Sequence, residues 1–322
     1  MVHNIGIVGS GKMGQDIFNY LNDFDFHLFW FTRTPGKREK LEKSYSKKIA
    51  RQLKHNLITQ EQFEQKSKNQ ITGYLSDLSG CDLIIETIVE DIDAKLYLFS
   101  DLKTIVQPGC IIVSNSSSIL PSYLSTYFPV AGMHFFYPIA FKNIVELILP
   151  DNYNSDRAER LKDFLSSINK KYVIQNERNA FLLNRFLLDL QGKVFHYSIG
   201  QNFSLKLVDQ ISQTFVQDFG LFEMMDHVGL STMNQSIQNY ALMDSHPEKY
   251  DALLDRLNEK IALGQPMLET DSDYEVDKKS SAAILAFLRK EIQETYNQYL
   301  LNQPIHDDIY KNALKEFCGL EL

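Results

Sequence analysis

Short apolar runs alternate with longer polar or amphipathic stretches over the first 180 residues, and the rest of the chain lacks such runs. Each run has the length and composition of a buried β-strand. The runs lie at residues 3–8, 27–32, 82–88, 110–113, 130–133, 144–149 and 172–175. The stretches between them have helical periodicity, as at residues 15–21, 33–54 and 59–68. This alternation predicts an α/β fold with a mixed, doubly wound sheet of the Rossmann type.

Beyond about residue 180, apolar residues recur at intervals of three and four, which is typical of helices. The pattern is interrupted near Gly200, Gly220, Gly229, Pro247 and the polar segment 269–277. We therefore expect two domains. The first is a Rossmann domain at residues 1–180 with a basic helical excursion at 35–70. The second is an all-helical domain at 181–322 that serves substrate binding and dimerisation and carries a C-terminal extension.

The composition restricts the classes of function. At 322 residues and 44% hydrophobic, the chain is long and apolar enough for two folded cores. A net charge of -8 argues against a nucleic-acid partner, which usually requires a basic surface. Cys81, Cys110 and Cys318 lack metal-ligand spacing, so we expect no metal site and a reducing, cytoplasmic location. No signal peptide or membrane-length apolar segment is visible, so we expect no membrane partner.

The first apolar run leads directly into glycines at GxGxxG spacing, followed by a predicted helix. In this context the first glycine permits a tight turn, the second a close approach of a pyrophosphate, and the third close packing of helix on strand. The pattern predicts dinucleotide binding by Gly9, Gly11, Lys12, Met13 and Gly14. The alternative is a glycine turn with a purely structural role.

The second apolar run ends in Thr32 and Arg33, where an NAD site usually has an acidic residue for the ribose hydroxyls. A hydroxyl followed by a guanidinium can bind a 2′-phosphate through charge-assisted hydrogen bonds. We therefore favour NADP over NAD as the cofactor. The alternative is that Arg33 is a solvated loop residue and the site merely tolerates the phosphate.

The helical stretch 33–54 carries nine Lys or Arg against two Glu, a local charge of +7. Its apolar positions recur every four residues at Leu41, Tyr45, Ile49 and Leu53. Such a helix is often just a solvated face. It can also receive an anionic carrier, either the phosphates of coenzyme A or the acidic surface of an acyl carrier protein.

Two further segments contain candidate chemistry. The strand at 110–113 runs into the polar cluster Ser114–Ser118, at the end of a parallel strand where ligands bind in open sheets. An ordinary helix cap is the alternative for this cluster. The segment GMHFFYPIAFKNIVEL contains His134 and Glu146 in mostly apolar surroundings. A buried imidazole with a carboxylate partner can act as a general base near neutral pH, although a structural core histidine is the alternative.

Together these segments resemble the 3-hydroxyacyl-CoA dehydrogenase family over most of residues 3–265. The resemblance rests on the glycine loop, IIETIVEDIDAKLYLF, SNSSS, GMHFFYP with VEL after it, and NRFL followed by DFGLFEMMDHVGL. It implies hydride transfer at C3 of a 3-hydroxyacyl thioester, with His134 as general base and Glu146 orienting it. It also implies that Ser117 and Asn184 hold the substrate oxygen. The resemblance likewise implies that Glu90 and Lys95 lie near the nicotinamide side of the cofactor. Asn115 of the polar cluster is also predicted to bind the cofactor.

The chain departs from the family pattern at several points. Tyr137 replaces the asparagine of HFFNP, Ala180 replaces a glycine, and Thr32 and Arg33 replace the ribose-binding aspartate. Residues past about 280 extend beyond the usual enzyme. The segment from Phe186 weakly resembles the one from Phe287, which indicates a partly duplicated helical unit.

Several readings of function and assembly therefore stay open. The protein is expected to be a homodimer, or a monomer with a partly duplicated C-terminal unit. The main alternative function is an enzyme acting on a carrier-protein thioester in a biosynthetic pathway. A second alternative is a non-catalytic cofactor-binding protein.

Overall fold

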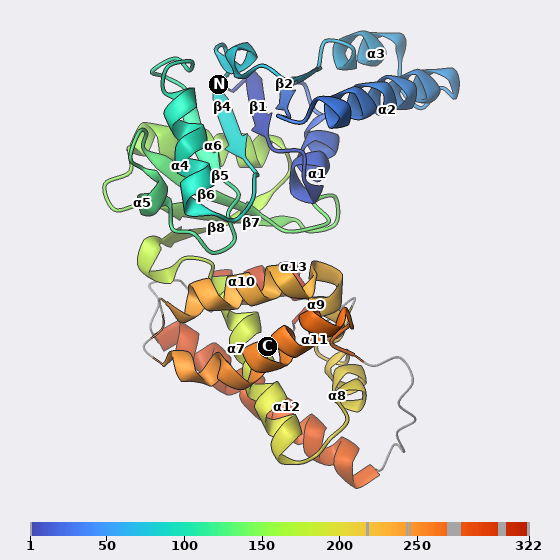
Figure 1. The fold of residues 1–322 in the computed structure, drawn as a ribbon, viewed down its shortest axis with the longest axis vertical. Coiled ribbons are helices and arrows are strands. Elements are labelled where there is room, and N and C mark those ends of the chain that lie inside the picture. The colour runs from blue at the N-terminus through green and yellow to red at the C-terminus, as the bar shows by residue number, and fades with distance from the viewer. Residues whose placement is uncertain are drawn as a thin grey trace. The chain divides into compact units, whose positions relative to one another are not determined.

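The computed structural model of the protein describes residues 2–216, 219–242, 244, 246–268, 278–301 and 307–320. The chain forms two compact units, residues 1–180 and 181–322 (Figure 1). The predicted fold class, a Rossmann-type sheet followed by an all-helical part, is confirmed. The predicted polar break at 269–277 lies outside the described residues.

Within residues 2–216, one sheet has the strand order β3-β2-β1-β4-β5-β6-β7-β8. Strands β1 to β6 are parallel, β7 is antiparallel to β6, and β8 is parallel to β7. The strands are β1 (Asn4–Val8), β2 (His27–Phe31), β3 (Gln70–Thr72), β4 (Leu83–Glu86), β5 (Ile111–Ser114), β6 (Val130–Phe135), β7 (Ile144–Leu149) and β8 (Lys171–Asn176). The order reverses between β1 and β4, which creates a ligand-binding crevice at the carboxyl ends of these strands.

Helices lie on both faces of this sheet (Figure 1). They are α1 (Lys12–Leu21), α2 (Pro35–Lys54), α3 (Gln60–Lys66), α4 (Ile92–Leu102), α5 (Pro121–Leu124) and α6 (Ser155–Ser167), with the 3₁₀ turns η1 (Leu75–Leu78) and η2 (Glu177–Asn179). Ile5 and Ile7 belong to one apolar core, whereas Val8 and Ile84 belong to a second core. Burial on both faces explains why these strands read as continuous apolar runs in the sequence.

The basic excursion forms α2 and α3, which extend from the β2 side of the sheet (Figure 1). Tyr45 and Ile49 of α2 are buried, so the basic side chains occupy its other faces. The Tyr45 hydroxyl donates to Asn22 Oδ1 at 2.6 Å and anchors the helix. The excursion ends in β3, a short edge strand beside β2 that the sequence pattern did not predict.

The second unit is helical throughout its described residues. Its elements are α7 (Leu182–Gly200), α8 (Leu205–Ser212), α9 (Glu223–Val228), α10 (Leu230–Ala241), η3 (Pro247–Tyr250), α11 (Asp251–Leu263), α12 (Lys278–Leu301) and α13 (Asp307–Cys318). Helix α7 packs against α8, α11, α12 and α13. The buried Asp189 of α7 accepts hydrogen bonds from Tyr250 and Tyr299, each at 2.5 Å. The C-terminal extension is therefore part of this core.

A cavity of about 590 Å³ lies beside Asp189, between α7, η3 and α12. Its lining contains none of the predicted site residues. Lys249 of this lining forms ion pairs with Asp189 at 2.8 Å and Asp244 at 2.7 Å. The residues that line this cavity all belong to the second unit.

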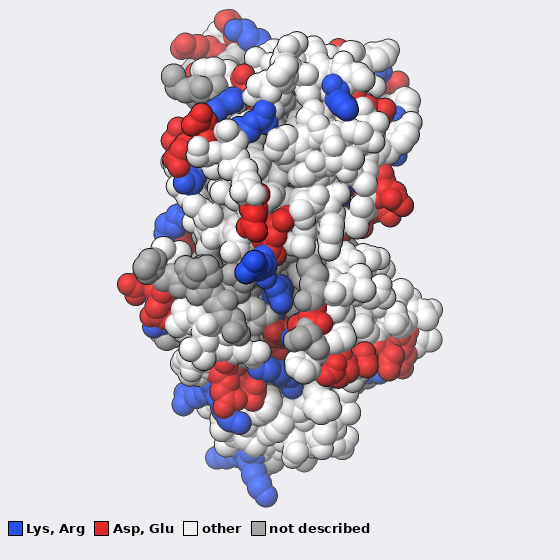
Figure 2. Space-filling model, turned by 90° about the vertical axis from the view of Figure 1, so that its left-hand side faces the viewer, with Lys and Arg blue, Asp and Glu red and all other residues white. Residues whose placement is uncertain are grey.

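Acidic and basic side chains are interspersed on the face shown in Figure 2. No helix of the described residues is both long and apolar enough to span a membrane. The three cysteines are buried and free, and burial raises the pKa values of Cys81 and Cys110 to about 12. These two thiols are therefore protonated at neutral pH.

Candidate active site

The glycine loop joins β1 to α1 at the crevice of the sheet. Gly9 has φ +120°, which favours glycine, and a Cβ at Gly14 would lie 2.1 Å from the Gly9 carbonyl oxygen. No atom lies within 4 Å of a Cβ built on Gly11, the N-cap of α1, and no side chain caps this helix. The loop therefore offers uncapped N–H groups at a helix N-terminus beside open space, which fits a dinucleotide pyrophosphate.

Two side chains of β2 and its end contact this loop. Trp30 donates from Nε1 to the Gly9 carbonyl oxygen at 2.8 Å, and the buried Thr32 donates from Oγ1 to Ser10 Oγ at 2.9 Å. Arg33 follows in an exposed bend and forms no ion pair with the described residues. Trp30 and Thr32 thus fix the glycine loop, and the guanidinium of Arg33 follows the end of β2.

His134 and Glu146 are directly opposite each other on the antiparallel strands β6 and β7. Their side chains are buried, and His134 Nδ1 lies 2.8 Å from Glu146 Oε2. The other carboxylate oxygen accepts a hydrogen bond from Gln175 of β8, at 2.8 Å from its Nε2. A carboxylate held in this way places the Nδ1 proton toward Glu146, which makes Nε2 the basic nitrogen. The predicted histidine–carboxylate pair is therefore formed.

Asn115 connects the loop after β5 to the histidine strand. Its Oδ1 accepts a hydrogen bond from the backbone N–H of Phe135 at 2.9 Å. Phe135 directly follows His134, and the Phe136 ring packs edge-on against the imidazole at 4.5 Å between centroids. Asn115 thus fixes the end of β6 from the neighbouring loop.

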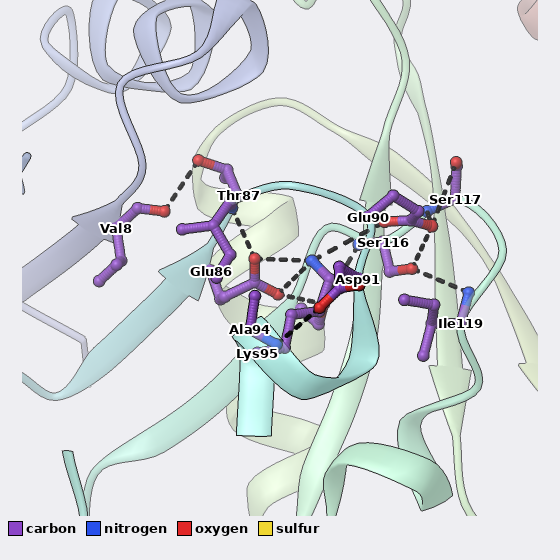
Figure 3. A network of polar contacts seen from close by, with 12 residues as sticks. Val8, Glu86, Thr87, Glu90, Asp91, Ala94, Lys95, Ser116, Ser117 and Ile119 are labelled. Carbon is purple, nitrogen blue, oxygen red and sulfur yellow. Dashed lines mark hydrogen bonds and ion pairs between the residues drawn. The ribbon is translucent and has the colours of Figure 1, made fainter. Parts of the chain in front are cut away.

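Glu90 holds the serine turn that contains Ser117 (Figure 3). Its Oε1 accepts hydrogen bonds from the backbone N–H groups of Ser117 at 2.9 Å and Ser118 at 2.8 Å, and from the Ser116 hydroxyl at 2.5 Å. Burial alone would raise the pKa of Glu90, but Lys95 and the hydrogen bonds from Ser116 and Ser118 outweigh burial and lower it. Glu90 is therefore a carboxylate at neutral pH, and it orders the turn.

Lys95 forms a buried ion pair beneath this turn (Figure 3). Its side chain is 1% exposed, and Nζ lies 2.7 and 2.8 Å from the two oxygens of the fully buried Glu86. Glu90 Oε2 is 3.8 Å from the same ammonium. Ser114 Oγ also donates to Glu86, at 2.6 Å. The enclosure of Lys95 favours an indirect role, in which it fixes the two glutamates that border the crevice.

Asn184 lies in the first turn of α7 and belongs to the second unit. Its contribution to the site stays a prediction. Gly9, Gly11, Thr32 and Asn115, by contrast, all lie in the first unit together with the histidine pair.

Several residues of the site were missed by the sequence pattern. Gln175, Glu86 and Trp30 each contact a predicted site residue. Glu86 and Gln175 are polar residues in otherwise buried strand segments, and that placement is a signal for a structural or functional partner. The sequence does not reveal which partner each one meets.

Comparison with known proteins identifies the family. Residues 4–178 match the family described as 3-hydroxyacyl-CoA dehydrogenase, NAD binding domain. The chain belongs to the 3-hydroxyacyl-CoA dehydrogenase family. It is accordingly an NAD-dependent oxidoreductase of this family. The family predicted from the motifs is confirmed, whereas the preference for NADP over NAD stays a prediction. The matched residues include the glycine loop, the Glu90 turn and the His134–Glu146 pair, whereas Asn184 follows them.

Individual relatives support this family assignment. The chain is 26% identical over 239 residues to a 3-hydroxybutyryl-CoA dehydrogenase of Bradyrhizobium diazoefficiens, covering 72% of this chain and 81% of that protein. It is 26% identical over 257 residues to the mitochondrial hydroxyacyl-coenzyme A dehydrogenase of Sus scrofa, covering 76% and 82%. A solved (S)-3-hydroxybutyryl-CoA dehydrogenase from Ralstonia eutropha has a TM-score of 0.73 at 21% identity, covering 84% of this chain and all of that one. The last comparison supports the fold.

Proposed function

We propose that the protein transfers hydride between a nicotinamide dinucleotide and C3 of a 3-hydroxyacyl thioester, with 3-hydroxyacyl-CoA as the favoured substrate. The observation that carries this proposal is the buried His134–Glu146 pair at 2.8 Å. His134 lies on β6, which is parallel to β1, so both strands end at the same edge of the sheet. The general base and the glycine loop therefore belong to one crevice edge.

The roles of the histidine and its partners follow from their contacts. When bound, the dinucleotide supplies the hydride acceptor or donor. His134 Nε2 accepts the hydroxyl proton of the substrate in oxidation and returns it in reduction. Glu146 holds the Nδ1 proton and stabilises the positive imidazolium, and Gln175 fixes the carboxylate for that task. This arrangement lowers the cost of a charge that exists only after proton transfer.

Ser117 is proposed to donate a hydrogen bond to the oxygen on C3. Glu90 Oε1 accepts hydrogen bonds from its backbone N–H at 2.9 Å and from its hydroxyl at 3.5 Å, so Glu90 fixes the turn that carries this hydroxyl. Asn184 is proposed as a second donor to the same oxygen, as the family motif implies. Losing one such donor typically raises the barrier by about 2–4 kcal/mol.

The family supports NAD, and we propose in addition that the site accepts NADP preferentially. The support is local: Thr32 is uncharged and tied to Ser10, and the exposed Arg33 has no carboxylate partner among the described residues. A 2′-phosphate would meet a guanidinium there instead of the repulsion of an acidic side chain. The Arg33→Ala variant should lose NADPH efficiency relative to NADH, and an unchanged ratio would contradict this preference.

The substrate carrier is proposed to be coenzyme A, and helix α2 supports an anionic carrier in general. Its buried face contains Tyr45 and Ile49, which leaves the lysines and arginines for solvent or ligand. The acidic surface of an acyl carrier protein would suit the same helix. Greater efficiency on a carrier-protein thioester than on the CoA ester would favour that alternative.

Assembly and location also stay predictions. The longer helix α7 is followed by the shorter α8, and the longer α12 is followed by the shorter α13. The two sequence segments that resemble each other begin in α7 and α12. This pairing supports a partly duplicated C-terminal unit, in a monomer or a homodimer. We retain a cytoplasmic location as a prediction from the free cysteines.

A matrix of NADH and NADPH against CoA and carrier-protein 3-oxoacyl thioesters of several lengths tests the proposed function. We expect turnover with at least one short 3-oxoacyl-CoA. Dinucleotide binding without turnover on any thioester would favour the non-catalytic alternative and contradict the proposal.

A further inference from the structure

Lys12 places a positive charge at the start of helix α1, where the helix dipole is also positive. The first turn of α1 contains no acidic residue, and Lys12 forms no ion pair with any described residue. A cation at this end of a helix is unfavourable unless an anion neutralises it. The surroundings of Lys12 therefore favour a negatively charged ligand.

The Lys12 ammonium is held by an aromatic ring from the histidine segment. Its Nζ lies 3.8 Å from the centroid of the Tyr137 ring, a cation–π geometry. Lys12 is exposed and Tyr137 is 47% exposed, so this contact does not enclose the lysine side chain. The side chain is positioned without being neutralised.

The segment that bears Tyr137 is fastened to α1 at a second point. Asp16, one helical turn after Lys12, accepts a hydrogen bond from the Ile139 backbone N–H at 2.7 Å. The buried Lys170 donates to the carbonyl oxygens of Ile139 at 2.5 Å and Lys142 at 2.9 Å. The Tyr137 ring is therefore attached to a fixed segment, and it can act as a platform for the lysine.

The space beside this platform is the open side of the glycine loop. Gly11 precedes Lys12, and no atom lies within 4 Å of the position that a Cβ on Gly11 would take. The N–H groups of the first turn carry no side-chain cap. Charge, open space and backbone donors thus coincide at one place.

We propose that the Lys12 ammonium, positioned by the Tyr137 ring, binds the pyrophosphate of the dinucleotide. The proposal rests on the dinucleotide binding in the proposed function, and it adds side-chain recognition to a loop whose sequence pattern concerns the backbone. It also gives Tyr137 a role: the residue is a positioning residue that links the cofactor loop to the segment after His134. The pyrophosphate is common to NAD and NADP, so this contact is independent of the choice made at Arg33.

Titration of NADH fluorescence at low and high salt tests this proposal without any need for turnover. Lys12→Met should raise the Kd for NADH by roughly five- to tenfold at low salt, and less at high salt, because salt screens an exposed charge. Lys12→Arg should restore most of the affinity. Tyr137→Phe keeps the ring and should bind as the wild type does, whereas Tyr137→Leu should weaken binding. In the double variant Lys12→Met, Tyr137→Leu the losses should be less than additive.

Lys103→Met is the matched control, because Lys103 also lies over a tyrosine ring, that of Tyr127 at 5.5 Å. Lys103 directly follows α4, which begins after the carboxyl end of β4 and runs back toward the opposite edge of the sheet. The Kd of this variant for NADH should therefore equal that of the wild type. An unchanged Kd in Lys12→Met would overturn the proposal. So would a loss confined to NADPH, which indicates the 2′-phosphate, or a loss confined to acyl-CoA binding. Wild-type protein that binds NADH but turns over no thioester would refute the proposed function alone.

Discussion

The buried pair of Lys95 and Glu86 gives a stability prediction whose size follows from the structure. Lys95→Met removes an ammonium that contacts both oxygens of Glu86, at 2.7 and 2.8 Å. Glu86 is fully buried, and it keeps two donors, the Ser114 hydroxyl and the Ile88 backbone N–H, each at 2.6 Å. Removing one partner of a buried ion pair typically lowers the free energy of unfolding by about 3–5 kcal/mol, because the other charge stays buried without it. Because two donors persist, we expect a loss near the lower end, about 3 kcal/mol.

The assay is urea unfolding followed by tryptophan fluorescence. The chain has a single tryptophan, Trp30, which is buried in β2 and therefore reports on the first unit alone. A double variant, Lys95→Met with Glu86→Gln, removes both charges and should recover most of the loss. A loss below about 0.5 kcal/mol in the single variant, or no recovery in the double variant, would refute this reasoning.

Three further predictions concern other parts of the chain. Gly14→Ala should weaken NADH binding at least tenfold in a titration, because its Cβ would lie 2.1 Å from the Gly9 carbonyl oxygen; unchanged affinity would contradict the tight loop. Gln175→Leu should lower kcat by roughly tenfold, since it removes the hydrogen bond from Gln175 Nε2 to the Glu146 carboxylate; kcat equal to wild type would exclude that role. Burial raises the pKa of Asp209 to about 6, above its unfolded value, so its contribution to stability is present below about pH 4 and is lost as the pH rises through 6. In chemical unfolding followed by circular dichroism, the free energy of unfolding of Asp209→Asn should therefore rise relative to that of the wild type between pH 4 and 7. A difference between the two proteins that stays constant over this pH range would contradict the prediction.

The strands of the sheet were predictable from sequence because most are buried on both faces. Their apolar runs are continuous, as in β4 and β5, and the pattern located them within a few residues. Strand β3 was missed because it has only 3 residues, Gln70–Thr72, and lies at the edge of the sheet. A run that short cannot show strand periodicity, and its pairing with β2 depends on where the preceding helical excursion returns.

The chemistry of the site was predictable in residue type but not in connectivity. The spacing of His134 and Glu146 is compatible with a pair, yet only the antiparallel register of β6 and β7 places them opposite each other. Lys95 forms a buried pair with Glu86, a contact between a helix and a strand end that the sequence did not reveal, and its predicted place at the cofactor stays a prediction. Such contacts depend on how elements pack, and no local pattern encodes them. The role of Asn184 depends on the second unit and stays a prediction.

The most direct test of the central claim compares wild type with His134→Gln in the reduction of acetoacetyl-CoA by NADH, alongside NADH binding. Removing the general base, whose contact with Glu146 is 2.8 Å, should lower kcat by about a thousandfold while the Kd for NADH changes less than about twofold. His3→Gln, an exposed histidine before β1, should behave as wild type. Retention of turnover within about tenfold of wild type in His134→Gln would contradict the account, because the proton would then be moved by another group.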